Sequence, residues 1–128
     1  MSLNFISDTF MKNLTIKCAI PGNINNILFK NSSAVGSELR FENCKINNLK
    51  FYNSIIECET ELANITLKQF SAENTTIRSV TTDNIKFVDS EGGANFYRVL
   101  RLLNEKNRLE DKADYFLSSK CVLGVKLG

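Results

Sequence analysis

The first 90 residues repeat a seven-residue pattern of polar and apolar positions. The pattern begins with a polar residue, usually Asn, and has apolar residues at its second and fourth positions, the fourth often being Phe. An amide or acid, followed by Ser or Cys, closes it. The clearest copies are 26–32 and 48–54, and less regular ones lie at 13–19, 38–44, 64–70, 76–78 and 84–90.

Each copy predicts a short strand, because apolar residues two apart lie on one face of an extended chain. Strands this short are poorly suited to a sandwich, but they can stack as coils of a solenoid. The copies at 26 and 48, and those at 64 and 84, are 22 and 20 residues apart, a suitable length for one coil. We therefore expect about four irregular coils of a right-handed β-helix; an antiparallel sandwich with Asn-rich turns is the alternative.

The repeat also assigns positions within each coil. Asn suits tight corners, because it tolerates left-handed backbone conformations. We expect interior ladders of Phe29, Phe41, Phe51 and Phe87. We expect corner residues at Asn31, Asn43, Asn53 and Asp89. Small residues behind the corners are Ser32, Cys44, Ser54 and Ser90, and Cys18 takes a corner position.

The hydrophobic period becomes helical from Ala94 onward. The apolar residues at i, i+3, i+4 and i+7 are Phe96, Val99, Leu100 and Leu103. Ser90 or Asn95 is a candidate helix cap, and Asn107 is expected to end the helix in a left-handed conformation. A second helix over 109–118 would complete a hairpin that covers the last coil.

The expected fold is therefore mostly β, a short right-handed β-helix of about four irregular coils capped by a C-terminal α-helical hairpin. We divide the chain into an N-terminal segment with a candidate capping strand (1–12), the repeats (13–91), the hairpin (92–118) and a tail (119–128). We expect the tail to be truncated and the chain to be part of a longer protein.

The repeats and the residues that follow them resemble bacterial pentapeptide-repeat proteins. The resemblance rests on the stacked Asn-apolar units, on 94–100 (Ala-Asn-Phe-Tyr-Arg-Val-Leu), on 107–109 and on 113–116 (Ala-Asp-Tyr-Phe). The quintet pattern is matched well only at 63–67, so a regular square coil is not expected. The resemblance implies a non-enzymatic scaffold or interaction module and carries no functional residue over.

The composition of the chain limits the kinds of catalytic and binding site that it can form. The chain has 128 residues, a net charge of +2, sixteen Asn and no His. Without His, a Ser-His or Cys-His nucleophile pair within the chain is excluded. We expect no enzymatic activity, no catalytic residue, no cofactor and no metal, and the balanced charge argues against a nucleic-acid partner.

The four cysteines predict reduced, buried thiols. They are widely spaced in the sequence, and a zinc site would need all of them. No signal peptide and no run of 18 apolar residues is present, so we expect a cytoplasmic protein with no membrane insertion by this segment.

One acidic group stands out. Glu57, Glu59 and Glu61 alternate along a predicted strand and would share one face, as in a cation or glycosidase-like site. A charged, solvent-facing strand is the preferred interpretation.

We expect a structural or protein-interaction module that binds a protein partner or associates with itself. The candidate partner-binding residues on the helices are Tyr97, Arg98, Arg101 and Tyr115. Two alternatives remain open: a β-helix that binds or processes polysaccharide, and a soluble regulatory domain of a membrane protein.

Overall fold

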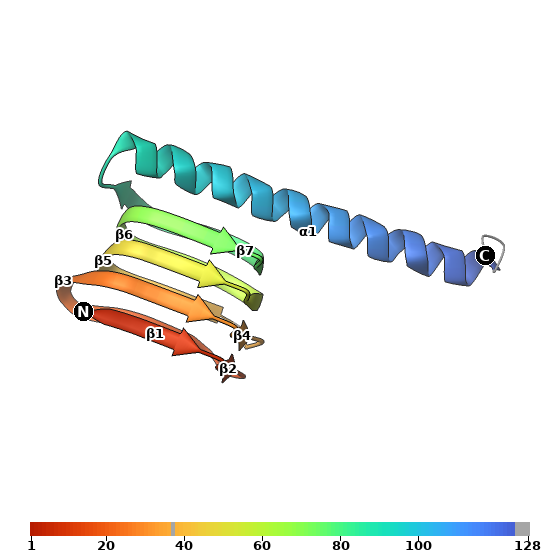
Figure 1. Cartoon of the computed structure of the whole chain (residues 1–128), viewed down its shortest axis with the longest axis horizontal. Helices are drawn as coiled ribbons and strands as arrows, with labels where there is room; N and C mark the ends of the chain where they lie inside the picture. The colour runs from red at the N-terminus through yellow and green to blue at the C-terminus, as the bar shows by residue number, and fades with distance from the viewer. Residues whose placement is uncertain (37, 125–128) are drawn as a thin grey trace.

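A computed structural model describes the backbone of residues 1–36 and 38–124, and the side chains of these residues except 19–21 and 110–124. In that part of the chain, strands are followed by a single helix (Figure 1). The elements are β1 (Ser2–Ile6), β2 (Thr9–Phe10), β3 (Leu14–Lys30), β4 (Ser33–Ala34), β5 (Glu38–Tyr52), β6 (Ile55–Glu73), β7 (Thr76–Phe87) and α1 (Ser90–Gly124).

The strands stack in parallel and in register. Ser2, Asn26, Asn48 and Gln69 are successive partners in the stack, at intervals of 24, 22 and 21 residues. The chain therefore forms a β-solenoid of about four coils, residues 2–25, 26–47, 48–68 and 69–87. This parallel stacking confirms the β-helix and excludes the antiparallel sandwich.

The interior contains the predicted phenylalanines, in more than one column. Phe5, Phe29 and Phe51 stack with ring centroids 4.7 and 4.9 Å apart. Phe41 instead pairs in register with Leu62, and its ring meets Phe29 edge-on across the interior at 6.3 Å. Phe87 pairs with Leu67. Phe41 and Phe87 thus lie outside the column of Phe5, Phe29 and Phe51, because two-residue periodicity shows which residues face inward but not which side of the coil they occupy.

Asparagines form the corners, as expected. Two ladders of side-chain amides connect successive coils, one through Asn31, Asn53 and Asn74 and one through Asn43, Asn64 and Asn84. Their amide hydrogen bonds are 2.7 to 3.2 Å long. Among the described non-glycine residues, those with left-handed φ, between 47° and 62°, are Ser7, Asn31, Asn43, Asn53, Asn64, Asn74 and Asn84; Cys18, expected at a corner, is not one of them.

Small hydroxyl residues lie directly behind the first of these ladders. Ser32, Ser54 and Thr75 are buried, and their hydroxyls connect neighbouring coils. The Ser32 N–H donates to Ser54 Oγ at 3.1 Å, and the Ser54 N–H donates to Thr75 Oγ1 at 3.3 Å. The hydroxyl row therefore satisfies buried backbone groups at the corner.

Asp89 is not a corner residue. Its Oδ1 accepts the N–H of Gly92 at 2.7 Å, the geometry of a helix N-cap. Ser90, expected behind a corner, is the exposed first residue of α1. A side chain at position 92 would collide with the carbonyl oxygen of Lys68, so Gly92 lets α1 begin against β6.

One continuous helix replaces the expected hairpin. α1 passes through Asn107 without a turn, and Asn107 has no left-handed φ. Its side-chain amide donates to the carbonyls of Ile77 and Arg78, at 2.7 and 3.2 Å. Asn107, which the sequence suggested as the end of the helix, therefore contacts the last coil instead. The second helix expected over 109–118 is part of α1, and the side chains from 110 onward lie outside the described residues.

α1 covers the C-terminal end of the solenoid. Phe96 is buried between Phe70 and Phe87, with centroid distances of 5.2 and 5.3 Å. Asn95 Nδ2 donates to the Phe70 carbonyl, and Lys106 Nζ donates to the Thr75 carbonyl, at 3.0 and 3.2 Å. Figure 1 shows α1 along the β7 end of the stack and β1 and β2 at the opposite end.

Candidate functional site

The N-terminal end of the solenoid is the first candidate surface. β1 pairs with β3 and β2 with β4, and no other described strand pairs with either of them. β1 and β2 are thus edge strands with one unpaired side. We call this surface the open edge; it comprises β1, β2 and the apolar side chains Leu3, Phe5, Phe10, Leu14 and Ile16.

The direction of the β1 amides follows from two hydrogen bonds. The Met1 carbonyl accepts from Asn25 at 2.8 Å, and the Ser7 N–H donates to Lys30 at 2.9 Å. Because backbone groups alternate in direction along a strand, the odd-numbered residues of β1 face β3. The N–H groups of Ser2, Asn4 and Ile6 therefore point away from the stack.

Apolar side chains lie behind these amides. Phe5 stacks on Phe29 on one side and meets Phe10 edge-on at 5.5 Å. The five apolar side chains of the open edge are partly buried and pack on the core. The open edge is therefore one end of the solenoid interior. It combines these apolar side chains with the outward-pointing N–H groups of β1.

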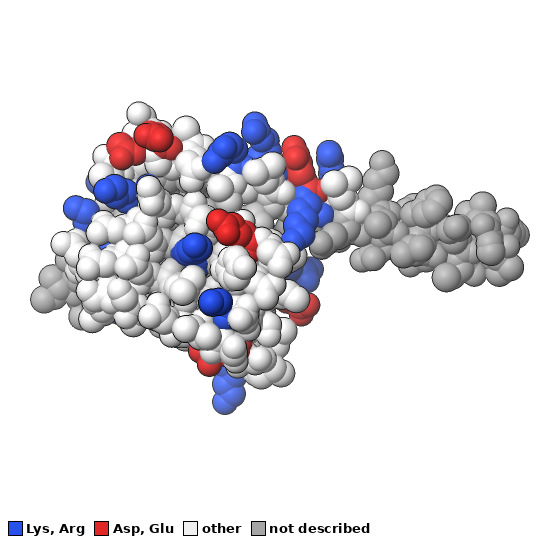
Figure 2. Space-filling model, in the orientation of Figure 1, with Lys and Arg blue, Asp and Glu red and all other residues white. Residues whose placement is uncertain are grey.

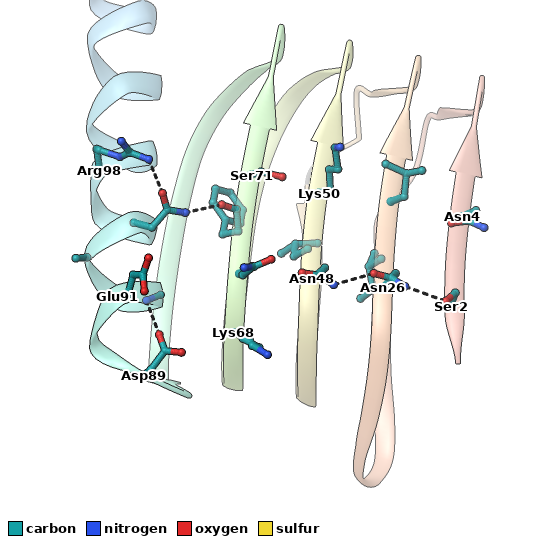
Figure 3. Close-up of a pocket in the computed structure, with 18 residues that line it drawn as sticks. Ser2, Asn4, Asn26, Asn48, Lys50, Lys68, Ser71, Asp89, Glu91 and Arg98 are labelled. Carbon is teal, nitrogen blue, oxygen red and sulfur yellow. Dashed lines mark hydrogen bonds between the residues drawn. The ribbon is translucent and has the colours of Figure 1, made fainter.

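A groove is the second candidate surface. It has a volume of about 980 Å³ and lies between the first turns of α1 and the outer face of the adjacent strands (Figure 3). Its neutral polar side chains are Ser2, Asn4, Asn26, Asn48, Gln69, Ser71 and Asn95. Its charged side chains are Lys50, Lys68, Asp89, Glu91 and Arg98.

Hydrogen bonds order several of the side chains in this groove. Asn48 Nδ2 donates to Asn26 Oδ1 at 2.9 Å, and Asn26 Nδ2 donates to Ser2 Oγ at 3.3 Å. On the helix side, Arg98 Nη2 donates to Asn95 Oδ1 at 2.6 Å. The groove therefore presents amides and hydroxyls at the spacing of the coils.

The candidate partner-binding residues are divided between two surfaces. Arg98 lines the groove, whereas Tyr97 and Arg101 line a shallower depression of about 370 Å³ along α1. Tyr97 is 56% exposed, and its ring also contacts Phe87 and Phe96. Tyr115 lies on α1, but its side chain is outside the described residues.

Glu57, Glu59 and Glu61 alternate with buried residues, so they do face outward together. They are not equivalent, however. Glu61 pairs with Arg40, and Glu59 accepts the hydroxyl of Thr81 at 3.1 Å. Two of the three carboxylates thus have partners on neighbouring strands, as in a solvated, charge-paired sheet face.

Arg40 is the centre of a charge cluster on that face. Its guanidinium contacts Glu38, Glu42 and Glu61, and Lys17 Nζ lies 3.7 Å from Glu42 Oε2. The hydrogen bond from Arg40 lowers the pKa of Glu42 below its ordinary value of 4.5. The same bond raises the pKa of Arg40. The ion pairs of this cluster therefore connect the first three coils.

Neither a group of possible metal ligands nor a membrane-spanning helix is found in the described part of the chain. Its His, Cys, Asp and Glu side chains form no group of three or more that could hold a metal ion. No described helix is long and apolar enough to cross a membrane. On the face in Figure 2, basic and acidic side chains are interspersed without a continuous basic patch.

Comparison of the chain with protein-family models, with curated proteins and with solved structures found no match. The geometry of the two surfaces is therefore the basis for an argument about function.

Sequence reasoning missed both the open edge and part of the corner ladder. Residues 2–6 (Ser-Leu-Asn-Phe-Ile) follow the start of the repeat pattern, and Ser7-Asp8 reverses its last two positions; Phe5 has the position of Phe29 and Ser7 that of Asn31. Asn74 and Thr75 lie 21 residues after Asn53 and Ser54. The positions of these residues in the repeat therefore already indicated a first coil at the N-terminus and a corner at Asn74.

Proposed function

We propose that this chain is a non-enzymatic interaction module that associates with a second copy of itself through the open edge. The observation that carries this proposal is the asymmetry of the two ends. α1 covers the last coil, whereas no described element covers β1 and β2. Resemblance to bacterial pentapeptide-repeat proteins implies the same kind of role, although coils of 24, 22 and 21 residues depart from multiples of five.

The open edge favours another coil as its occupant. Unpaired strand edges recruit further strands, and here the edge follows the outline of a coil. A second copy has an edge of the same outline, with Phe5 and Phe10 at its centre. Two copies related by a two-fold axis would pair their edge strands in an antiparallel orientation.

The covered end limits the assembly. Because α1 covers the last coil, the C-terminal end of each copy is not available to a third copy. The proposal therefore specifies a closed, head-to-head dimer rather than a filament.

Sedimentation equilibrium on the purified chain tests this proposal. We expect a reversible monomer–dimer equilibrium. Asn4→Pro removes an N–H that points away from β3, and proline is tolerated on an edge strand, so the variant should fold but associate more weakly. Asn4→Ala keeps the N–H and is the matched control. A monomer at all concentrations, or equal association of both variants, would overturn the proposal.

The groove favours a second candidate function, binding of a neutral polysaccharide. Its rows of amides and hydroxyls can hydrogen-bond sugar hydroxyls, and the ladder of Asn48, Asn26 and Ser2 holds three of these groups in fixed positions. A glycan array would test it. Binding that is reduced by Asn48→Ala but not by Asn47→Ala, which lies outside the groove lining, would support this function. An array without binding would contradict it.

A further inference from the structure

Two cysteine side chains meet where the first coil stacks on the second. Cys18 Sγ lies 2.6 Å from Cys44 Sγ, and the two residues are 26 positions apart in the sequence. A disulfide bond is about 2.05 Å long, so a shift of roughly half an ångström would bring the sulfurs to bonding distance.

The backbone geometry also suits a bond. Neighbouring strands lie about 4.8 Å apart. Disulfides span Cα separations of about 4.4 to 6.8 Å, and Cys18 and Cys44 lie in adjacent coils, although Cys44 is in register with Gly22 and not with Cys18. Cys18 follows Lys17, which pairs with Glu42, and Cys44 pairs with Gly22. The two cysteines therefore flank a shift in register between the first two coils.

We propose that Cys18 and Cys44 form a disulfide under oxidising conditions and thereby fasten the first coil to the second. This proposal does not depend on self-association. The third described cysteine, Cys58, is buried, and no sulfur contact is found for it among the described side chains.

Disulfide formation removes two electrons from the cysteine sulfurs, and a disulfide oxidant such as oxidised glutathione can accept them. The Cys18 thiolate attacks one glutathione sulfur, forms a mixed disulfide and releases one glutathione thiolate. The Cys44 thiolate then attacks the Cys18 sulfur and releases the second glutathione. Two electrons pass from the cysteine sulfurs to glutathione, and the two glutathione thiolates take up the two protons.

Exposure sets the order of these steps. Cys18 is half-buried and accessible to the oxidant, whereas Cys44 is buried. Burial, with a contribution from the neighbouring Cys18, raises the pKa of the Cys44 thiol to about 12. The second step should therefore become faster as the pH is raised, because only the thiolate of Cys44 attacks.

Peptide mapping tests the proposal directly. The folded chain is incubated with oxidised glutathione, alkylated and digested with trypsin. We expect peptides 18–30 and 41–45 to be linked, and the link to be lost in Cys18→Ser and in Cys44→Ser. Cys58→Ser is the matched control and should retain the link.

A stability measurement provides an independent readout. The oxidised chain should melt about 10 °C above the reduced chain, since a bond that closes a loop of this length restricts the unfolded state. Dithiothreitol should reverse the shift. The proposal is overturned if Cys18 accumulates only as a glutathione adduct, or if the 18–44 link forms equally well in urea.

Discussion

Asn53 donates its side-chain amide to Asn31 Oδ1 at 2.7 Å, and both residues hold a left-handed backbone, with φ of 50° and 53°. A single residue type thus turns the chain and connects one coil to the next. Asn74 repeats the arrangement by donating to Asn53 at 2.7 Å. The high asparagine content of this sequence therefore has a structural cause.

Replacement of a corner residue should separate these two contributions. Asn53→Ala loses both ladder hydrogen bonds and places alanine in a left-handed conformation, so the free energy of unfolding should fall by about 2 kcal/mol. Asn53→Gly also loses the ladder but adopts this φ without strain, so the loss should be about 1 kcal/mol. Urea denaturation measures both.

Asn47 provides the matched control for the corner. It donates to Asn25 across the coils at 3.3 Å but has no positive φ. Asn47→Ala should therefore cost less than about 0.5 kcal/mol, as for most surface substitutions. Equal losses for Asn53→Ala and Asn53→Gly would contradict the backbone argument.

Thr60 is a site at which the protein can be stabilised. Its side chain is buried, its Oγ1 has no hydrogen-bond partner among the described residues, and it stacks between Leu39 and Val80. Thr60→Val removes the unsatisfied hydroxyl at nearly constant shape. We expect the free energy of unfolding to rise by about 1 kcal/mol.

Thr75 is equally buried, but its hydroxyl accepts from Ser54 and donates to Glu73. Thr75→Val should therefore destabilise the protein by about 1 to 3 kcal/mol. The same substitution is thus expected to have opposite signs at the two positions. A loss of stability in both variants would contradict this interpretation of Thr60.

The helical cap depends on Phe96. Phe96→Ala leaves a cavity between Phe70 and Phe87, so unfolding should become easier by about 3 to 5 kcal/mol. Tyr97→Ala, one residue away on the exposed side, should cost much less. Thermal unfolding followed by circular dichroism would compare the two, and similar melting temperatures would show that α1 is not held by Phe96.

The Arg40 cluster predicts a dependence on pH. The pKa of Glu42 is lower in the folded protein than its ordinary 4.5, so the carboxylate stabilises the fold above that pH. This contribution is lost as the pH falls through the folded pKa. Glu42→Gln should be less stable than the wild type at pH 7, and the difference should shrink below about pH 4.5.

Denaturation at several pH values would measure that difference. The Arg40→Gln background is the control, because removal of the arginine also removes the main cause of the pKa shift. A stability difference between the wild type and Glu42→Gln that does not change with pH would assign the effect to something other than the ion pair. The same conclusion would follow if Glu42→Gln cost as much in the Arg40→Gln background.

Local patterns predicted much of the fold. The corners at Asn31, Asn43 and Asn53 follow from residue type and spacing, because few residues tolerate a left-handed turn. The side of the coil to which Phe41 belongs, and the continuous course of α1 through Asn107, depend on contacts far apart in the sequence. Asp89 matched the corner pattern, but its carboxylate caps the helix.

The candidate surfaces were harder to predict. The open edge is defined by the absence of a neighbouring strand among the described residues, and no residue type marks such a position. The groove exists because the first turns of α1 dock beside the last coil, and its lining extends from there across the stacked strands as far as Ser2 and Asn4. Tyr97 and Arg98 were recognised as exposed helical residues, but their division between two surfaces depends on how α1 docks.

Residue-resolved amide hydrogen exchange at low and high protein concentration tests self-association through the open edge most directly. In dilute protein, the amides of Leu3 and Phe5, which face β3, should be protected, and those of Asn4 and Ile6 should exchange rapidly. At high concentration, Asn4 and Ile6 should become protected as their N–H groups bond to a second copy. Unchanged exchange at Asn4 and Ile6, or new protection on α1 alone, would contradict association through the open edge.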